Sequence, residues 1–306
     1  MKKLIRKTLA AVAILSLLSI VPVNKAGAQF SASISLQTFY DDLDPYGQWV
    51  QDPDYGYVWI ADAEPGFRPY YTRGHWVMTP YGATWVSDYN WGWAPFHYGR
   101  WAYSSYYGWV WMPDTEWGPA WVSWRTGGDA YGWAPLGPGI SINFTFGSGY
   151  NTPDDWWVFV PSRYAFEPSF YNYRIAPERN VTYINNTTII NNTYNKNNVV
   201  YATGPSVRDV ERASGKKIPV YSVANDSKPG RTAIQGNAVK AYRPQVAKSG
   251  QGKPADAISR DQYVQKKGER HIAPDKPAQR TQENKQQPQT DRQQQQQLSL
   301  LESKAF

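Results

Sequence analysis

All fifteen tryptophans of this 306-residue chain lie between Trp49 and Trp157, and seventeen of its 23 tyrosines lie between Tyr40 and Tyr173. Within this block the apolar residues alternate in short runs such as Trp109-Val110-Trp111, and Gly, Pro, Asp or Asn interrupts the runs every five to ten residues. Aromatic and β-branched runs with this punctuation are typical of short antiparallel strands and not of helices. The chain contains no cysteine, so its stability must come from packing and not from disulfides. We therefore expect an all-β domain.

The aromatic block is internally duplicated. Four short elements recur in the same order: residues 47–50 with 99–102, 55–60 with 107–112, 81–87 with 117–123, and 92–95 with 132–135. In this register a first copy, with an insertion around Pro65 to Pro80, is followed by a second copy. A second register reads four hairpins of about 25 residues, built on Trp49, Trp76, Trp101 and Trp124. Hairpins of this size cannot bury their apolar faces alone. Either register therefore predicts duplicated antiparallel hairpins that pack as a barrel or a sandwich.

The N-terminus has the three regions of a secretory signal peptide. Residues 2–7 contain four cations, residues 9–23 are almost entirely apolar, and Ala26-Gly27-Ala28 supplies the small side chains that precede a cleavage site. We expect cleavage before Gln29, which makes residues 1–28 the signal peptide. The alternative is an uncleaved anchor, but an apolar core of roughly 15 residues is shorter than the ~20 that span a bilayer comfortably. The chain is therefore expected to be exported to the periplasm or the outer envelope.

The charge of the remaining chain is divided between two halves. Residues 29–180 contain seven Arg, no Lys and fifteen Asp or Glu, a formal charge of −8, whereas residues 181–306 contain twenty cations and ten anions, a charge of +10. In an exported protein the expected partners of a basic half are envelope polymers, lipid headgroups or the protein's own acidic domain. Peripheral attachment to a membrane through the basic tail stays open, and nucleic acid is not expected as a partner.

Residues 181–244 differ in texture from the acidic aromatic domain at 29–180. Asn-Asn pairs recur every six residues from Asn185 to Asn198, which fits either a short β-helical ladder or a polar linker with some strand character. Ser206 and Asp209 form a capping box and Gly215 suits a helix end, so residues 206–215 are predicted to be a helix.

The remaining signals before the terminus are short. Residues 218–223 are predicted to be a strand, and residues 232–242 a hairpin around Gly236-Asn237. From about residue 245 to residue 306, Gln, Lys, Pro and Arg dominate. Such a segment has too little apolar surface to offset chain entropy, so we expect a disordered tail.

Several runs resemble a known family. They are residues 85–101 (WVSDYNWGWAPFHYGRW), 117–125 (WGPAWVSWR) and 131–138 (YGWAPLGP). These runs resemble the Trp/Gly-rich Y-x-W-G-x-W-type repeats of a family of uncharacterised exported proteins of diderm bacteria. The Asn-rich stretch and residues 204–221 are similar to the downstream part of that family, so the resemblance covers roughly residues 40–245. It implies an envelope location and brings no established activity.

Exposed indole and phenol rings can bind sugars. A pyranose packs its C–H groups on a π surface while neighbouring carboxylates, amides or arginines bind its hydroxyls. Large aromatics also dominate β-domain cores, so we expect two thirds or more of the tryptophans to be structural. The Gly-Trp-Ala-Pro segments, which are predicted to be turns, are the best candidates for exposed rings. The candidate ligand-binding residues are Trp93, Trp133, Trp117, His97, Asp88, Glu116 and Arg125.

Enzymatic and metal sites have weaker support. His97 could act as a general base oriented by Asp88 or Glu116, but we expect it to be a hydrogen-bonded residue of a sheet. The chain has no Cys, and of its three His only His75 and His97 lie outside the basic tail, so a zinc site is not expected. The carboxylates in Asp52-Pro-Asp54-Tyr-Gly56 lack the spacing and the glutamate of an EF-hand, so neither calcium nor a cofactor is expected. Paired carboxylates of the glycosidase kind are not decided by sequence, because their pairing is spatial.

Together these features favour a non-catalytic envelope protein that binds a glycan or another envelope component through its aromatic domain. The alternative is a structural or protein-interaction role in the envelope, and a hydrolase is a third hypothesis. Arg68, Arg100 and Arg125 lie among aromatics, where stacking or ion pairing is the expected role.

Overall fold

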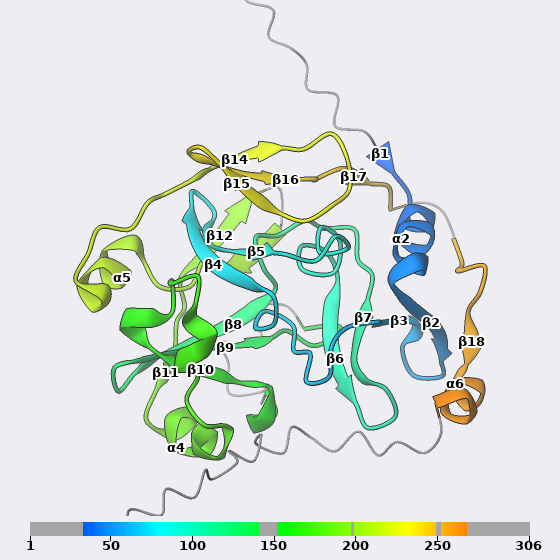
Figure 1. Cartoon of the computed structure of the whole chain (residues 1–306), viewed down its shortest axis with the longest axis horizontal. Coiled ribbons are helices and arrows are strands. Elements are labelled where there is room, and N and C mark those ends of the chain that lie inside the picture. The colour runs from blue at the N-terminus through cyan, green and yellow to red at the C-terminus, as the bar shows by residue number, and fades with distance from the viewer. Residues whose placement is uncertain (1–32, 141–151, 197–198, 249–251, 268–306) are drawn as a thin grey trace, which may run out of the picture. The chain divides into compact units, whose positions relative to one another are not determined.

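The computed structural model describes residues 33–140, 152–196, 199–248 and 252–267 (Figure 1). The chain divides into two units, residues 1–32, which include the expected signal peptide and lie outside the described ranges, and residues 33–306. The second unit consists mainly of strands arranged in several sheets, with a few short helices. This confirms the all-β fold class, in a sandwich-like arrangement of sheets. Among the helices of the described residues, none combines the length and apolar character required to cross a bilayer.

Four antiparallel hairpins form the centre of this unit, one for each 25-residue element. They are β2 (Gly47–Asp52) with β3 (Gly56–Ala61), β4 (Gly74–Thr79) with β5 (Gly82–Ser87), β6 (Arg100–Ser104) with β7 (Gly108–Met112), and β8 (Val122–Gly127) with β9 (Ala130–Pro135). The register built on Trp49, Trp76, Trp101 and Trp124 therefore describes the structural repeat. The matches of residues 47–50 with 99–102 and of 55–60 with 107–112, which lie 52 residues apart, relate the first hairpin to the third.

In each hairpin a tryptophan of one strand lies directly opposite a tryptophan of the other, and β7 carries Trp109 in addition. The cross-strand pairs are Trp49 with Trp59, Trp76 with Trp85, Trp101 with Trp111, and Trp124 with Trp133. All eight side chains are buried. Aromatic cross-strand pairs stabilise a sheet, and each large ring also removes considerable apolar surface from water. The paired tryptophans are therefore the repeated core of the domain.

Glycines make room for these rings. A Cβ atom on Gly47 would lie 2.6 Å from Trp59 Nε1, and one on Gly99 would lie 2.7 Å from Trp111 Nε1. Each of these glycines precedes the first tryptophan of its hairpin by two residues. Only a residue without a side chain allows the indole of the second strand to lie so close to the backbone.

Three of the four hairpins belong to two larger sheets. The first has the order β18-β2-β3-β7-β6, in which β18 is Ile258–Ser259, and it joins the first and third hairpins through the pair Trp59 and Trp111. The second has the order β10-β9-β8-β11, in which β10 (Val158–Pro161) and β11 (Thr188–Ile189) flank the fourth hairpin. The β4–β5 hairpin forms a separate two-stranded sheet.

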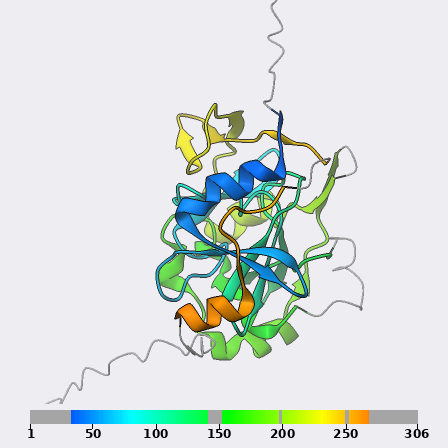
Figure 2. The ribbon, with the colours of Figure 1, turned by 90° about the vertical axis from the view of Figure 1, so that its right-hand side faces the viewer.

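Helices and short strands surround this core. The helical elements are α2 (Leu36–Leu43), η1 (Asp44–Tyr46), η2 (Asp154–Trp156), η3 (Ser162–Tyr164), η4 (Phe170–Tyr173), η5 (Pro177–Arg179), α4 (Asn180–Asn185), α5 (Val207–Ser214) and α6 (Arg260–Lys267). The remaining strands are β1 (Ser33–Ile34), β12 (Thr193–Lys196), β13 (Val199–Ala202), β14 (Ser222–Asn225), β15 (Ala233–Gln235), β16 (Ala238–Ala241), β17 (Gln245–Val246) and β18 (Ile258–Ser259). In Figure 2, β2 and β3 lie between α2 and α6.

The structure confirms two of the local predictions beyond residue 180. Helix α5 begins after Ser206, whose Oγ accepts a hydrogen bond from the Asp209 N–H at 3.2 Å, and ends at Gly215 with a left-handed φ of 73°. Strands β15 and β16 form the expected hairpin around Gly236. The strand expected at 218–223 is displaced, because β14 begins only at Ser222.

The described residues of the asparagine-rich stretch do not form a β-helical ladder. Strand β11 pairs with β8, while β12 and β13 pair with each other in antiparallel fashion. The side-chain amide of Asn186 donates to the Thr182 carbonyl, and that of Asn192 donates to the Gly204 carbonyl. These asparagines therefore satisfy backbone carbonyls of neighbouring segments instead of stacking on one another.

Part of the expected disordered tail is ordered. Residues 252–267 contain β18, which pairs in parallel with β2, and helix α6. Local composition predicted disorder because it offers little apolar surface, but Tyr263 is buried against Tyr107. Long-range contacts thus supply what the local sequence lacks. Residues 268–306 lie outside the described ranges.

Candidate functional site

The tryptophans expected to be exposed are buried. Trp93 is 2% exposed and Trp133 is 0% exposed, and fourteen of the fifteen tryptophans are buried in all. Trp133 lies in β9, not in a turn, and its indole N–H donates to the Tyr70 carbonyl at 2.8 Å. Trp93 does lie in a turn, but the rings of Phe39 and Tyr242 pack on it at 5.3 and 5.0 Å. The prediction of exposed rings was wrong because segments distant in sequence cover both.

Trp117 is the one tryptophan that is only partly buried, and protein groups contact its ring. His97 stacks on it at a centroid distance of 5.6 Å, and the Arg243 guanidinium carbon lies 4.9 Å from the ring centroid. Tyr81 packs against it edge-on at 5.5 Å. This ring is therefore part of an internal stack and not a free platform.

His97 is fully buried and hydrogen-bonded, but it lies in a turn segment outside the strands. Its Nδ1 lies 3.0 Å from the Gly118 carbonyl and its Nε2 lies 3.4 Å from Thr232 Oγ1. Burial lowers its pKa to about 4, although the Gly118 hydrogen bond opposes the shift. Both ring nitrogens thus face groups other than Asp88 and Glu116.

The two candidate carboxylates lie elsewhere. Glu116 forms an ion pair with Lys248 at 2.7 Å, and the exposed Asp88 lies near His75. Burial lowers the pKa of His75 despite that carboxylate. The structure therefore brings His97 together with Trp117, and it does not assemble the proposed base with either acidic partner.

The arginines have the expected stacking role. The Arg125 guanidinium lies 5.4 Å from the Trp157 ring and donates to Thr187 and to the Ile184 carbonyl. Arg100 lies 3.8 Å from the Trp121 ring centroid, and Arg68 lies 5.5 Å from that of Trp109. Arg125 is thereby tied to the segment before β11 and braces the fold.

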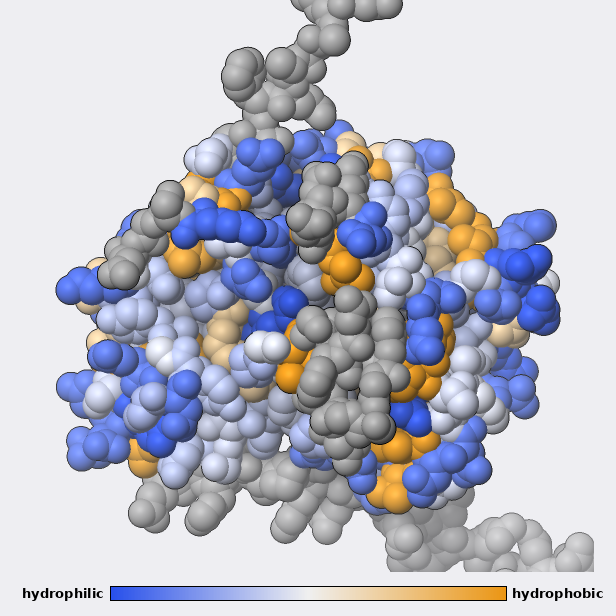
Figure 3. Space-filling model, turned by 180° about the vertical axis from the view of Figure 1, so that it is seen from behind, coloured by the Kyte–Doolittle hydropathy of each residue, from blue (hydrophilic) through white to orange (hydrophobic). Residues whose placement is uncertain are grey.

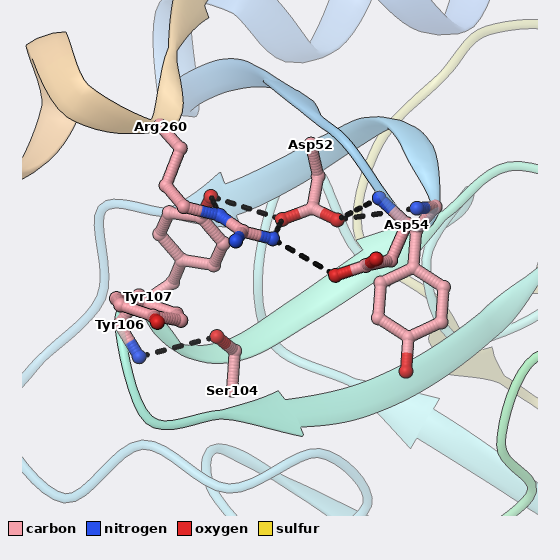
Figure 4. Close-up of polar contacts among 7 residues, drawn as sticks. Asp52, Asp54, Ser104, Tyr106, Tyr107 and Arg260 are labelled. Carbon is pink, nitrogen blue, oxygen red and sulfur yellow. Dashed lines mark hydrogen bonds and ion pairs between the residues drawn. The ribbon is translucent and has the colours of Figure 1, made fainter.

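Among the described residues, the large exposed aromatic rings are tyrosines. Tyr55 is 50% exposed and Tyr106 is 52% exposed, and these residues lie at the tips of the first and third hairpins. On the face shown in Figure 3, apolar residues form only separate patches within a mainly hydrophilic surface. We name the two hairpin ends, residues 52–56 and 104–108, together with Arg260, the hairpin-tip site (Figure 4).

Arg260 joins the two hairpin ends. Its Nη2 lies 2.9 Å from Asp52 Oδ2 and 3.0 Å from Asp54 Oδ2, while its Nε donates to the Tyr107 hydroxyl at 3.2 Å. The Tyr107 hydroxyl in turn donates to Asp52 Oδ2 at 3.0 Å. The guanidinium carbon also lies 4.8 Å from the centre of the Tyr106 ring. One cation is thus held by two carboxylates, a phenol and a π face.

Backbone hydrogen bonds fix both tips. Asp52 Oδ1 accepts from the backbone N–H groups of Asp54 and Tyr55 at 2.9 and 3.1 Å, and Ser104 Oγ accepts from the Tyr106 N–H at 3.2 Å (Figure 4). A short polar side chain at the end of each strand therefore defines its turn. The exposed tyrosines consequently project from rigid hairpins.

The electrostatics of the site keep Asp52 ionised. Burial alone would raise its pKa, but the hydrogen bonds from Arg260, Tyr107 and two backbone N–H groups lower the pKa below its ordinary value. The Asp52 hydrogen bond is also the main cause that raises the pKa of Arg260. Burial raises the pKa of Tyr107 to about 12. Asp54 remains open, since its side chain is 72% exposed.

The amino-acid sequence contains only a partial signal for this site. Tyr55-Gly56 and Tyr107-Gly108 are matched turns of the duplication, which marked the hairpin ends but not which rings are exposed. Asp52 and Asp54 faintly resemble a calcium loop in sequence, whereas the structure pairs both with Arg260. No described group of three or more His, Cys, Asp or Glu residues is placed to hold a metal ion. Arg260 could not be found because it follows Asp52 by 208 residues.

Comparisons with known proteins identify one family model. A family of unknown function (DUF6600) matches residues 40–140, the segment that contains all four tryptophan hairpins. The comparisons with curated proteins and with solved structures gave no match.

Proposed function

We propose that the chain is an exported, non-catalytic protein of the bacterial envelope that binds a glycan through the hairpin-tip site. The signal-peptide pattern at residues 1–28 and the resemblance to exported proteins support the location. The observation that carries the binding proposal is the pair of half-exposed rings, Tyr55 and Tyr106, beside the open carboxylate of Asp54.

The chemistry of the site suits a saccharide. The C–H face of a pyranose packs on a tyrosine ring, and the hydroxyls of the sugar donate to a carboxylate. Asp54 uses one oxygen to accept from Arg260, and an ionised carboxylate can accept several further hydrogen bonds. The tips therefore combine π surface with unused acceptor capacity.

The strands beneath the hairpin tips form a rigid scaffold, which favours ligand binding. The first and third hairpins share one sheet, and their tryptophan pairs lie in the common core. Side chains that project from rigid strands lose little conformational freedom when a ligand binds, and this favours affinity. The buried tryptophans thus support binding by positioning the tyrosines.

The test is a calorimetric titration of the whole chain from Gln29 to Phe306 with soluble peptidoglycan fragments and neutral oligosaccharides. We expect Tyr55→Ala and Tyr106→Ala each to weaken binding of the active glycan at least tenfold. Tyr171→Ala is the matched control, because Tyr171 is also 52% exposed but lies in η4. Absence of binding across the panel, or equal loss in the control, would refute the proposal.

A protein-interaction role in the envelope is the second candidate. The parallel strand that residues 258–259 add to β2 favours it, since the pairing shows that this sheet edge accepts an added strand. Crosslinking of the exported protein in its own cells tests this role. Specific envelope proteins, captured without dependence on saccharide, would support it.

A further inference from the structure

Residues 252–267, which we name the C-terminal strap, return to the first hairpin from the far end of the chain. Ile258 and Ser259 pair in parallel with Val50 and Gln51. Two side-chain contacts extend the docking, because Gln48 donates to the Asp256 carbonyl at 3.1 Å and Gln37 accepts from the Lys253 N–H at 3.2 Å. The strap thereby occupies the outer edge of β2 (Figure 2).

The strap has little order of its own. Strand β18 contains two residues and helix α6 contains eight. An isolated helix of that length is marginal in water. Within α6 only Tyr263 is buried, where it meets the Tyr107 ring edge-on at 5.4 Å. The order of the strap therefore depends on a small set of docking contacts.

Arg260 is the anchor among these contacts. Asp52, Asp54 and the Tyr107 hydroxyl surround its guanidinium at 2.9 to 3.2 Å, and the face of Tyr106 lies beside it. The hairpin tips belong to the half of the chain with a charge of −8, whereas the strap belongs to the half with a charge of +10. Charge complementarity thus selects a basic segment for this edge.

We propose that the β2 edge and the hairpin tips form an exchangeable docking surface for a basic segment of another protein, and that the strap is its resident occupant. The partner segment supplies an extended stretch parallel to β2, then an arginine, and an aromatic residue three positions later. This spacing places arginine and aromatic on one helix face, as Arg260 and Tyr263 are placed. Strand addition of this kind gains affinity from main-chain hydrogen bonds, and specificity from the side chains.

The test begins with Arg260→Asp in the full chain, which sets a carboxylate against Asp52 and Asp54. We expect hydrogen exchange of residues 47–52 to accelerate at least tenfold as the strap leaves. A labelled peptide of residues 252–267 should then bind this variant at least tenfold more tightly than the wild-type chain, in which the site is filled. Binding should weaken as salt is raised from 0.05 to 0.5 M, and a peptide with the same substitution should not bind.

Arg212→Asp is the matched control, because Arg212 also pairs with an aspartate, Asp209, at 3.2 Å on an exposed surface. It should leave exchange and peptide binding unchanged. Arg260→Gln provides the same test if the aspartate variant does not fold. Unchanged exchange in both Arg260 variants, or equal peptide binding by variant and wild type, would overturn the proposal.

Two further outcomes distinguish this proposal from self-association of the chain and from glycan binding. Concentration-dependent dimers that disappear in Arg260→Asp would assign the surface to a second copy of the chain and overturn the choice of partner. The proposal does not depend on glycan binding, and failure of the saccharide titration leaves the peptide result intact.

Discussion

The first and third hairpins differ from the second and fourth in how their tryptophan N–H groups are satisfied. In the first and third, every paired indole donates to a backbone carbonyl: Trp49 to Tyr40 and Trp59 to Leu43, both in α2, and Trp101 to Pro95 and Trp111 to Tyr98 in the loop before β6, at 2.7 to 3.2 Å. In the other two, only Trp133 does so. The indole nitrogens of Trp76, Trp85 and Trp124 are buried and have no protein acceptor in the part of the chain that the structure describes.

The loop before each hairpin explains part of this difference. Tyr98 precedes Gly99, and its carbonyl accepts from Trp111. At the corresponding place before Gly74 lies Arg73, whose φ of 48° is left-handed and whose carbonyl accepts from the Asp88 N–H at 2.9 Å. The tryptophan pairs are therefore held by directional hydrogen bonds in the first and third hairpins, and mainly by ring packing in the second and fourth.

The largest expected effect is on the second and fourth hairpins, whose tryptophan pairs are held mainly by ring packing. Trp76 lies 4.7 to 6.0 Å from the rings of Tyr70, Trp85, Trp124 and Trp133. We expect Trp76→Ala to lower the free energy of unfolding by about 3–5 kcal/mol, as measured by chemical denaturation. Because the rings contact one another, its effect should not add to that of Trp124→Ala. Strict additivity would show that these rings do not stabilise one another.

The next effect concerns the loop that supplies carbonyls to the third hairpin. Burial lowers the pKa of His97, within this loop, from 6.5 to about 4. Between those values the unfolded chain binds a proton that the folded chain does not, so stability falls as the pH drops. We expect a loss of about 3 kcal/mol, complete near pH 4 and absent above pH 7. Denaturation at several pH values checks it, and an identical pH dependence in His97→Gln would contradict it.

The comparison of the first and third hairpins with the second and fourth is tested most simply by replacing indole with a ring that lacks the N–H. Trp111→Phe leaves the Tyr98 carbonyl without its donor, whereas Trp85→Phe breaks no hydrogen bond to the described protein. We expect Trp111→Phe to be the more destabilising by about 1–2 kcal/mol. Equal losses of unfolding free energy in the two variants would show that the indole hydrogen bonds do not distinguish the two sets of hairpins.

The smallest effect is at the hairpin tips. Since the pKa of Asp52 is below its ordinary value of 3.8, its contribution to strap docking is present at neutral pH and is lost as the pH falls through that lower value. Asp54 is exposed, so Asp54→Asn should weaken docking by less than about 1 kcal/mol. Hydrogen exchange of residues 47–52 as a function of pH measures both. Release of the strap between pH 5 and 7 would contradict this account.

Local sequence was sufficient for the features that local rules control. Alternating aromatic runs predicted the strands, the tryptophan spacing predicted four hairpins, and Ser206 with Gly215 predicted α5. It failed where distant segments decide. Tyr242 covers Trp93, and β10 pairs with the strand that holds Trp133.

The candidate site illustrates the same limit. Trp117 and His97 do meet, but as a buried stack. Tyr55 and Tyr106 are exposed because hairpin tips project beyond the core, whereas the tryptophans lie in mid-strand. Arg260 belongs to a segment whose composition predicts disorder, and it is ordered by an acidic pair 206 and 208 residues away.

The most direct test of the account is an NMR titration of the full chain with the peptidoglycan fragments and oligosaccharides of the calorimetric panel, following indole N–H and tyrosine ring signals together. If the tryptophans are scaffold and the hairpin tips bind, the largest shifts will occur at Tyr55 and Tyr106, and the indoles of Trp93 and Trp133 will stay in place. The largest shifts at Trp93 or Trp133, with Tyr55 and Tyr106 unmoved, would contradict the account.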